Sequence, residues 1–178
     1  MKGNHMNGPG DVWNTVAAKW TEVAGQIDEA DWEKPTTCDG WNVKELVDHA
    51  MHWQAMGGGV LGAGTEPGQD WTTIQPALAA AFTDPTNLEG NAEAFGGMPK
   101  QGVAGLVIGD LLVHTWDLAR SIGADDTLPE AAVESTLMGL QRLPDEMLRS
   151  ENMFGPPVEI AEDASAQDKL IAFVGRQP

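Results

Sequence analysis

The sequence is poor in positive charge. It holds 10 Lys and Arg residues against 27 Asp and Glu residues, which gives a formal net charge of −17. A surface of this sign repels phosphate backbones and anionic membranes. We therefore expect no nucleic acid and no membrane among the partners. A polyanionic substrate is disfavoured for the same reason, unless a buried cation reverses the charge locally.

Cysteine, tyrosine and long apolar runs are scarce as well. The single cysteine, Cys38, excludes an internal disulfide and fits a reducing cytoplasm. No stretch approaches the roughly eighteen apolar residues of a membrane span. Residues 1–10 lack the apolar segment of a signal peptide, and we expect them to be a disordered leader or an expression remnant. We have no physical account of the seven Trp and the absence of Tyr.

The apolar periodicity predicts one all-α domain over residues 11–178. Hydrophobic residues make up 42% of the 178-residue chain, enough for an ordinary core. Strand alternation is not apparent. We expect a four-helix bundle with short additional helices. The four main helices are predicted near residues 11–27, 42–56, 71–82 and 102–123.

Helix starts are marked by capping residues. Asn42 is a good N-cap, and Glu45 stands at the third helical position, where it completes a capping box. Thr127 and Glu130 form the same pattern before a later helix, and Ser165 precedes the last one. These signals predict where the chain turns into each helix.

The predicted helix at residues 102–123 is apolar around its whole circumference, which indicates burial. Asp110, His114 and Asp117 nevertheless lie in its middle. Their spacings of four and three place them on one face. A buried carboxylate or imidazole without a partner costs several kcal/mol. We therefore predict that Asp110 and His114 bind a metal ion.

His49 is the best third ligand. It lies on the apolar stripe of the helix at residues 42–56, whereas His52 lies on a polar, solvated stripe of the same helix. A catalytic zinc usually has three protein ligands and one open position. Each of these polar residues alone is more simply explained by an ordinary hydrogen bond. The three together favour a site formed by His49, Asp110 and His114.

Three neighbouring residues have alternative roles. Asp117 either orients the His114 imidazole or binds a backbone amide or an arginine. Arg120 is a candidate for binding a substrate carboxylate, and equally for pairing with an acid at the end of its helix. Cys38 lies about 10 Å from His49 along the helix axis, at 1.5 Å per residue. We expect a structural role for Cys38 and no metal ligation.

Two segments carry a family resemblance, CDGWNVKELVDHAMHW (38–53) and GDLLVHTWDLARSIG (109–123). They resemble actinobacterial DinB-like metal-binding proteins related to the N-terminal domain of mycothiol-dependent maleylpyruvate isomerase. The C-terminal segments FGPPVEI and DKLIAFVGRQP are similar to a small uncharacterised branch of that family. The resemblance implies a DinB-like four-helix bundle that holds a divalent metal, often zinc or nickel, through His49, Asp110 and His114.

The resemblance also implies a chemistry, since several relatives use the metal to activate a low-molecular-weight thiol. A divalent cation holds a coordinating thiol deprotonated. We expect a cytoplasmic, zinc-dependent thiol S-transferase or isomerase-like enzyme that uses mycothiol and an electrophilic substrate. The isomerase has Glu at the position of Asp110 and a further C-terminal domain in its active site, so maleylpyruvate isomerase activity itself is not expected.

Two other functions and one question of assembly stay open. In the first, the metal is structural or sensory and the protein catalyses nothing. In the second, the protein is a metal-dependent hydrolase, with Asp117 as the only candidate base. A homodimer is also left open. An open coordination position would favour an enzyme, and a site closed by four protein ligands would favour a structural role.

Overall fold

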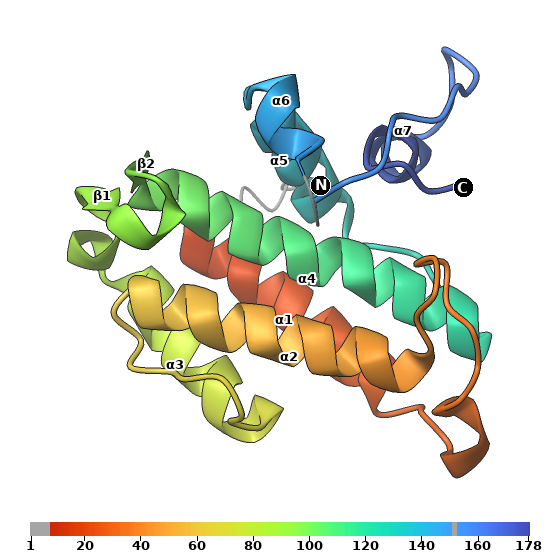
Figure 1. The fold of residues 1–178 in the computed structure, drawn as a ribbon, viewed down its shortest axis with the longest axis horizontal. Helices are drawn as coiled ribbons and strands as arrows, with labels where there is room; N and C mark the ends of the chain where they lie inside the picture. The colour runs from red at the N-terminus through yellow and green to blue at the C-terminus, as the bar shows by residue number, and fades with distance from the viewer. Residues whose placement is uncertain (1–7, 151–152) are drawn as a thin grey trace, which may run out of the picture.

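The computed structural model describes residues 8–150 and 153–178 and shows a helical bundle at its centre (Figure 1). α4 packs against α1 and α2, and α3 packs against the same two helices. In Figure 1, α3 and α4 lie on opposite sides of the α1–α2 pair. The predicted all-α four-helix bundle is therefore confirmed. The four helices are α1 (Pro9–Ala24), α2 (Val43–Val60), α3 (Trp71–Thr83) and α4 (Lys100–Ile122).

Shorter elements surround the bundle. α5 packs on α4 and α1, and α7 packs on α5. The short helices are α5 (Glu130–Leu140), α6 (Asp145–Leu148), α7 (Ala166–Phe173) and the 3-10 turns η1 (Glu29–Asp31), η2 (Pro85–Leu88) and η3 (Glu93–Phe95). Two strands of two residues each, β1 (Asn91–Ala92) and β2 (Met98–Pro99), pair antiparallel. Such a short pairing joins two turns and builds no sheet, so the class stays all-α.

The N-terminal leader expected at residues 1–10 is only partly described. Residues 1–7 lie outside the described residues. α1 begins at Pro9, and a proline in the first turn suits a helix start because its missing N–H is not needed there.

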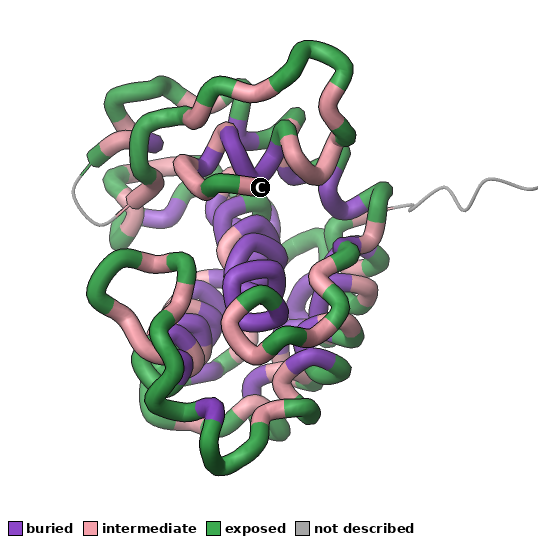
Figure 2. The backbone as a smooth tube through the Cα atoms, turned by 90° about the vertical axis from the view of Figure 1, so that its right-hand side faces the viewer, coloured by how far each residue is buried: buried purple, intermediate pink, exposed green. Residues whose placement is uncertain are grey.

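α4 is the central helix of the core. Every residue from Leu111 to Ala119 is buried, as the purple tube in Figure 2 shows. By length and composition α4 is apolar enough to cross a membrane, which exceeds what the sequence pattern indicated. However, 83% of its most apolar window is buried inside the protein. A core helix of a soluble bundle has this character.

Glycines allow α2 and α4 to approach closely. A Cβ atom on Gly57 would lie only 2.3 Å from Cγ2 of Val107 on α4. α2 runs through the glycines at residues 57–59 and ends at Val60, four residues beyond the predicted end near residue 56. The close approach brings side chains on the two helices within reach of one another.

The capping predictions have mixed outcomes. Asn42 and Glu45 form the expected capping box, with both reciprocal bonds at 2.9 Å. Ser165 accepts a hydrogen bond at the start of α7, as expected. The Thr127 prediction is wrong, because α5 begins directly at Glu130 without a side-chain cap.

Candidate metal centre

Three predicted ligands converge between α2 and α4. Nε2 of His114 lies 3.4 Å from Oδ1 of Asp110, and Nε2 of His49 lies 3.6 Å from the same oxygen. The two imidazole centroids are 5.0 Å apart. One ligand atom from each of the three residues lies within 4.8 Å of the others. Two imidazole nitrogens and one carboxylate oxygen are a donor set that suits a divalent transition metal.

The three candidate ligands differ in exposure. The side chain of His114 is 8% exposed, that of Asp110 is 15% exposed and that of His49 is 33% exposed. The site is therefore buried on the α4 side and open on the α2 side. Trp41 covers part of the open side, with its ring centroid 4.7 Å from that of His49.

Gln54 is a buried polar neighbour that the sequence reasoning missed. Its Nε2 donates to the Val107 carbonyl at 2.9 Å and lies 3.5 Å from Oδ2 of Asp110. The two oxygens of Asp110 thus have different neighbours, because Oδ1 faces the two histidines and Oδ2 faces Gln54. The sequence does contain a sign of this burial, because Gln54 follows Leu46 and Ala50 at spacings of four. It therefore lies on the same apolar stripe of the helix, and the structure shows both of these residues fully buried.

Asp117 lies directly behind His114. Its Oδ2 is 2.9 Å from Nδ1 of His114. Arg176 donates two further bonds to this carboxylate, from Nη2 to Oδ2 at 2.9 Å and from Nε to Oδ1 at 3.2 Å. The Thr37 hydroxyl donates to Oδ1 as well. Asp117 therefore contacts both His114 and an arginine, the partners named in its two alternative roles.

Charges alternate along this buried cluster. Burial raises the pKa of Asp117. The hydrogen bond from His114 and the charge of Arg176 outweigh burial and bring this pKa well below the usual carboxyl range. Burial lowers the pKa of His114, but the charge of Asp110 and the bonds to both carboxylates outweigh it and raise the pKa well above the usual value. His114 and His49 lower the pKa of Asp110 despite its burial. A metal ion at Nε2 of His114 would replace a proton there.

Cys38 lies close to this cluster, contrary to the distance argument made along the helix axis. Its Sγ is 3.5 Å from Oδ2 of Asp117 and 3.5 Å from Nη2 of Arg176. The loop before α2 turns back over α4, so axial distance from His49 does not describe its position. Cys38, His114 and Asp117 also form a ligand-like group. The guanidinium already on Cys38 and Asp117 opposes a cation there, so this group does not replace the first.

The two arginines have different surroundings. Arg120 is exposed, donates to Asp126 at 3.1 Å and stacks over the Trp116 ring at 5.0 Å. This is the helix-end pairing that the sequence offered as its second role, and Arg120 does not line the pocket described next. Arg176 is the cation at the site. It is 59 positions from Asp117, and no sequence pattern connects them.

A pocket of about 530 Å³ opens beside the three candidate ligands, and we call it the His–Asp pocket. His49, Asp110 and His114 all contribute to its lining. Residues 153–155 and 174–176 of the C-terminal tail form another part of its wall. The remaining wall is largely apolar and includes Trp41, Trp53, Leu106, Met153, Phe154 and Val174.

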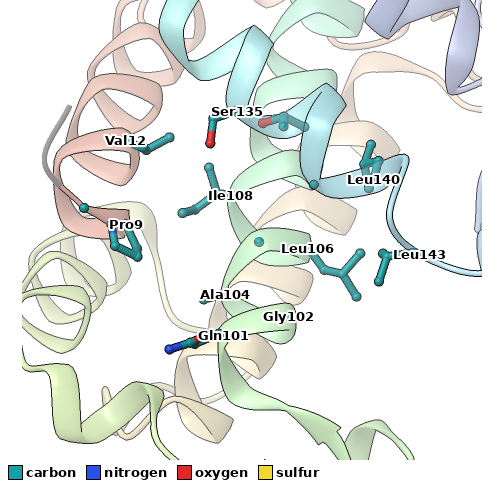
Figure 3. Close-up of a pocket in the computed structure, with 14 residues that line it drawn as sticks. Pro9, Val12, Gln101, Gly102, Ala104, Leu106, Ile108, Ser135, Leu140 and Leu143 are labelled. Carbon is teal, nitrogen blue, oxygen red and sulfur yellow. The ribbon is translucent and has the colours of Figure 1, made fainter. Parts of the chain in front are cut away.

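A second cavity of about 380 Å³ lies among α1, α4 and α5, and we call it the apolar cavity (Figure 3). Leu106 contributes to both cavities. The described lining of the apolar cavity contains no ionisable side chain, and its polar side chains are Gln101, Ser135 and Thr136. Of the two cavities, only the His–Asp pocket therefore has described side chains that could bind a metal or exchange a proton.

Comparison with known proteins agrees with the predicted resemblance. Residues 13–94 match the model of the mycothiol maleylpyruvate isomerase N-terminal domain family. The match spans α1 to α3 and includes His49. "Uncharacterized protein Rv0738" of Mycobacterium tuberculosis (strain ATCC 25618 / H37Rv) is 27% identical over 151 residues, 80% of this chain and 83% of the relative. "Uncharacterized protein MT0763" of Mycobacterium tuberculosis (strain CDC 1551 / Oshkosh) has the same identity and the same coverage. No solved structure matches the chain significantly.

Proposed function

Because residues 13–94 match the N-terminal domain family of mycothiol maleylpyruvate isomerase, we propose that this chain is a cytoplasmic, single-domain metalloprotein that activates a small thiol. The thiol is mycothiol or a similar molecule, and it reacts with an electrophilic substrate as in an S-transferase. The observation that carries this proposal is the convergence of His49, Asp110 and His114 at the edge of the His–Asp pocket.

The donor atoms favour zinc as the bound ion. His49 and His114 would supply imidazole nitrogens and Asp110 a carboxylate oxygen, a combination typical of catalytic zinc, with nickel as the second choice. When bound, the divalent ion supplies positive charge that holds a coordinating thiol in its thiolate form at neutral pH. Three protein ligands leave room for that thiol.

Asp117 and Arg176 position the buried ligand. With Nδ1 of His114 donating to Asp117, Nε2 faces Asp110 on the pocket side and is the nitrogen that would bind the ion. Arg176 neutralises the buried carboxylate and holds both of its oxygens. The imidazole is thereby fixed before any ion arrives, which reduces the entropy lost on binding.

The pocket supports a catalytic role over a purely structural or sensory one. A closed structural site needs no adjoining space, whereas these ligands adjoin about 530 Å³ lined by aromatic and apolar side chains. Hydrolysis with Asp117 as base is disfavoured, because both oxygens of Asp117 are already bonded and its side chain is fully buried.

Metal analysis tests the site directly. Protein purified without chelator should contain about one zinc or nickel ion per chain, and His49→Ala and His114→Ala should each lose it. His52→Ala is the matched control, since His52 is exposed on the same helix. Circular dichroism establishes that each variant is folded. The proposal fails if the wild type holds no stoichiometric metal, or if the ligand variants bind it as the control does.

A thiol assay then separates the enzyme from a binding protein. Loss of free mycothiol in the presence of an electrophilic acceptor should be faster with wild-type protein than with the His49→Ala variant. Chelation of the wild type should reduce the rate to that of the variant. A metal-loaded protein that leaves the uncatalysed rate unchanged would favour the structural or sensory role.

A further inference from the structure

We infer that the electrophile accepted by the His–Asp pocket is uncharged and largely apolar, with aromatic compounds the best fit. This inference rests on the proposed function and adds the substrate class to it. It follows from how the charges of the pocket are already paired and from the side chains that form the remaining wall.

The positive charge of the pocket is already paired within the protein. Arg176 is the only Lys or Arg in the described lining. Its Nε and Nη2 bond to Asp117, its Nη1 donates to the Val174 carbonyl at 3.0 Å, and Nη2 also contacts Cys38. The guanidinium therefore has no free edge with which to bind a substrate carboxylate in the bidentate geometry that arginine favours.

Apart from Arg176 and the two histidines, the charged side chains of the lining are carboxylates. Asp39 and Asp110 both contribute to the wall, and Asp117 lies behind His114 and balances Arg176. A divalent ion held by His49, Asp110 and His114 keeps a formal charge near +1, which one thiolate cancels. With a thiol bound, the pocket has no positive charge left to offset the desolvation of an anionic substrate.

The rest of the wall suits an apolar ring. Trp41, Trp53 and Phe154 supply aromatic surfaces, and Leu106 and Met153 supply aliphatic ones. Trp53 is held by an edge contact with Phe95, whose ring centroid lies 5.7 Å away. Aromatic side chains prefer offset-stacked or edge-on ring partners. Such a wall favours a neutral aromatic or conjugated substrate over a small dicarboxylate.

A pair of probes with one skeleton tests the charge preference. Dimethyl phthalate is neutral, phthalate is a dianion, and neither alkylates a thiol. Binding is measured by isothermal calorimetry and by quenching of tryptophan fluorescence, with protein as purified and saturated with mycothiol, so that the thiolate cancels the charge of the metal, and with protein after chelation. We expect dimethyl phthalate to bind at least about tenfold more tightly than phthalate, equivalent to about 1.4 kcal/mol. Equal or tighter phthalate binding, or no saturable binding of dimethyl phthalate, overturns the inference.

A charge-insertion variant locates the effect. Phe154→Arg places an unpaired cation in the wall and should shift the preference toward phthalate by at least about tenfold. Met153→Arg is the second variant should the first not fold. Met138→Arg is the matched control, because Met138 is 52% exposed on α5 and lines neither cavity. An unchanged preference in folded Phe154→Arg and Met153→Arg protein contradicts binding in this pocket.

The two proposals fail in different ways. Loss of the charge preference with normal metal uptake would refute the substrate class alone. Normal charge preference without stoichiometric metal would refute the metal function while leaving the selectivity of the pocket intact. The probes are therefore compared on the same preparations that are used for metal analysis.

Discussion

The two cavities beside α4 differ in chemistry far more than in size. The His–Asp pocket measures about 530 Å³ and the apolar cavity about 380 Å³. Both include Leu106, yet one holds two histidines, two aspartates, a cysteine and an arginine, and the described lining of the other holds no ionisable group. Volume alone would not separate a functional pocket from a packing gap. Buried polar groups separate them, because each requires a specific partner.

The largest expected loss of stability comes from breaking the buried Arg176–Asp117 ion pair beside the His–Asp pocket. Arg176→Met should lower the free energy of unfolding by about 3 kcal/mol, since it leaves the buried Asp117 carboxylate without its cation. Arg120→Met is the matched control, because its exposed pair with Asp126 should contribute about 0 to 1 kcal/mol. Urea denaturation measures both. Equal costs for the two variants would show that burial does not distinguish these pairs.

The second-largest loss of stability is expected at Leu106, which lies between the two cavities. Leu106→Ala removes a side chain that contributes to both walls and should cost about 2 kcal/mol. The cost should lie at the low end for Leu→Ala because cavities already adjoin this side chain. Thermal unfolding gives the stability, and the dimethyl phthalate titration should weaken at the same time. A loss of stability above about 4 kcal/mol would indicate that Leu106 is packed as tightly as a closed core residue.

The smallest effects contrast two glycines near α4. Gly57→Ala should destabilise by about 1 to 2 kcal/mol, since the new methyl group would press against Val107. Gly105→Ala meets nothing within 4 Å and should stabilise by about 0.5 to 1 kcal/mol through helix propensity. Chemical denaturation of both variants measures the difference. The same sign for both would show that α4 is packed alike toward α2 and toward the apolar cavity.

The features that could be predicted from the sequence are those carried by helical periodicity. The bundle follows from apolar spacing, and Asp110 and His114 stand one turn apart on a helix whose burial the sequence shows. His49 could be chosen over His52 because only one of them shares a stripe with apolar residues. These inferences need the geometry of single helices and no knowledge of how the loops run.

The missed features depend on the path of the chain between helices. Cys38 and Arg176 are 138 positions apart and meet because a loop and the C-terminal tail both turn over α4. Axial distance along α2 therefore gave a misleading position for Cys38. The capping pattern at Thr127 failed because Pro129 disfavours a helical conformation at Leu128. The Leu128 N–H instead donates to Oε1 of Gln167 on α7, and α5 begins only at Glu130. Short motifs state a local preference, and tertiary contacts decide whether it is used.

The distribution of ligands between helices bears on how function is transferred between homologues. The family match at residues 13–94 contains His49 but ends before α4, which carries Asp110 and His114. A homologue recognised through that segment alone is known to have at most one of the three candidate ligands. Inheritance of the site is better judged from an acid and a histidine four positions apart in the later core helix. By that criterion, homologues that kept the three-residue site can be separated from those that kept only the scaffold.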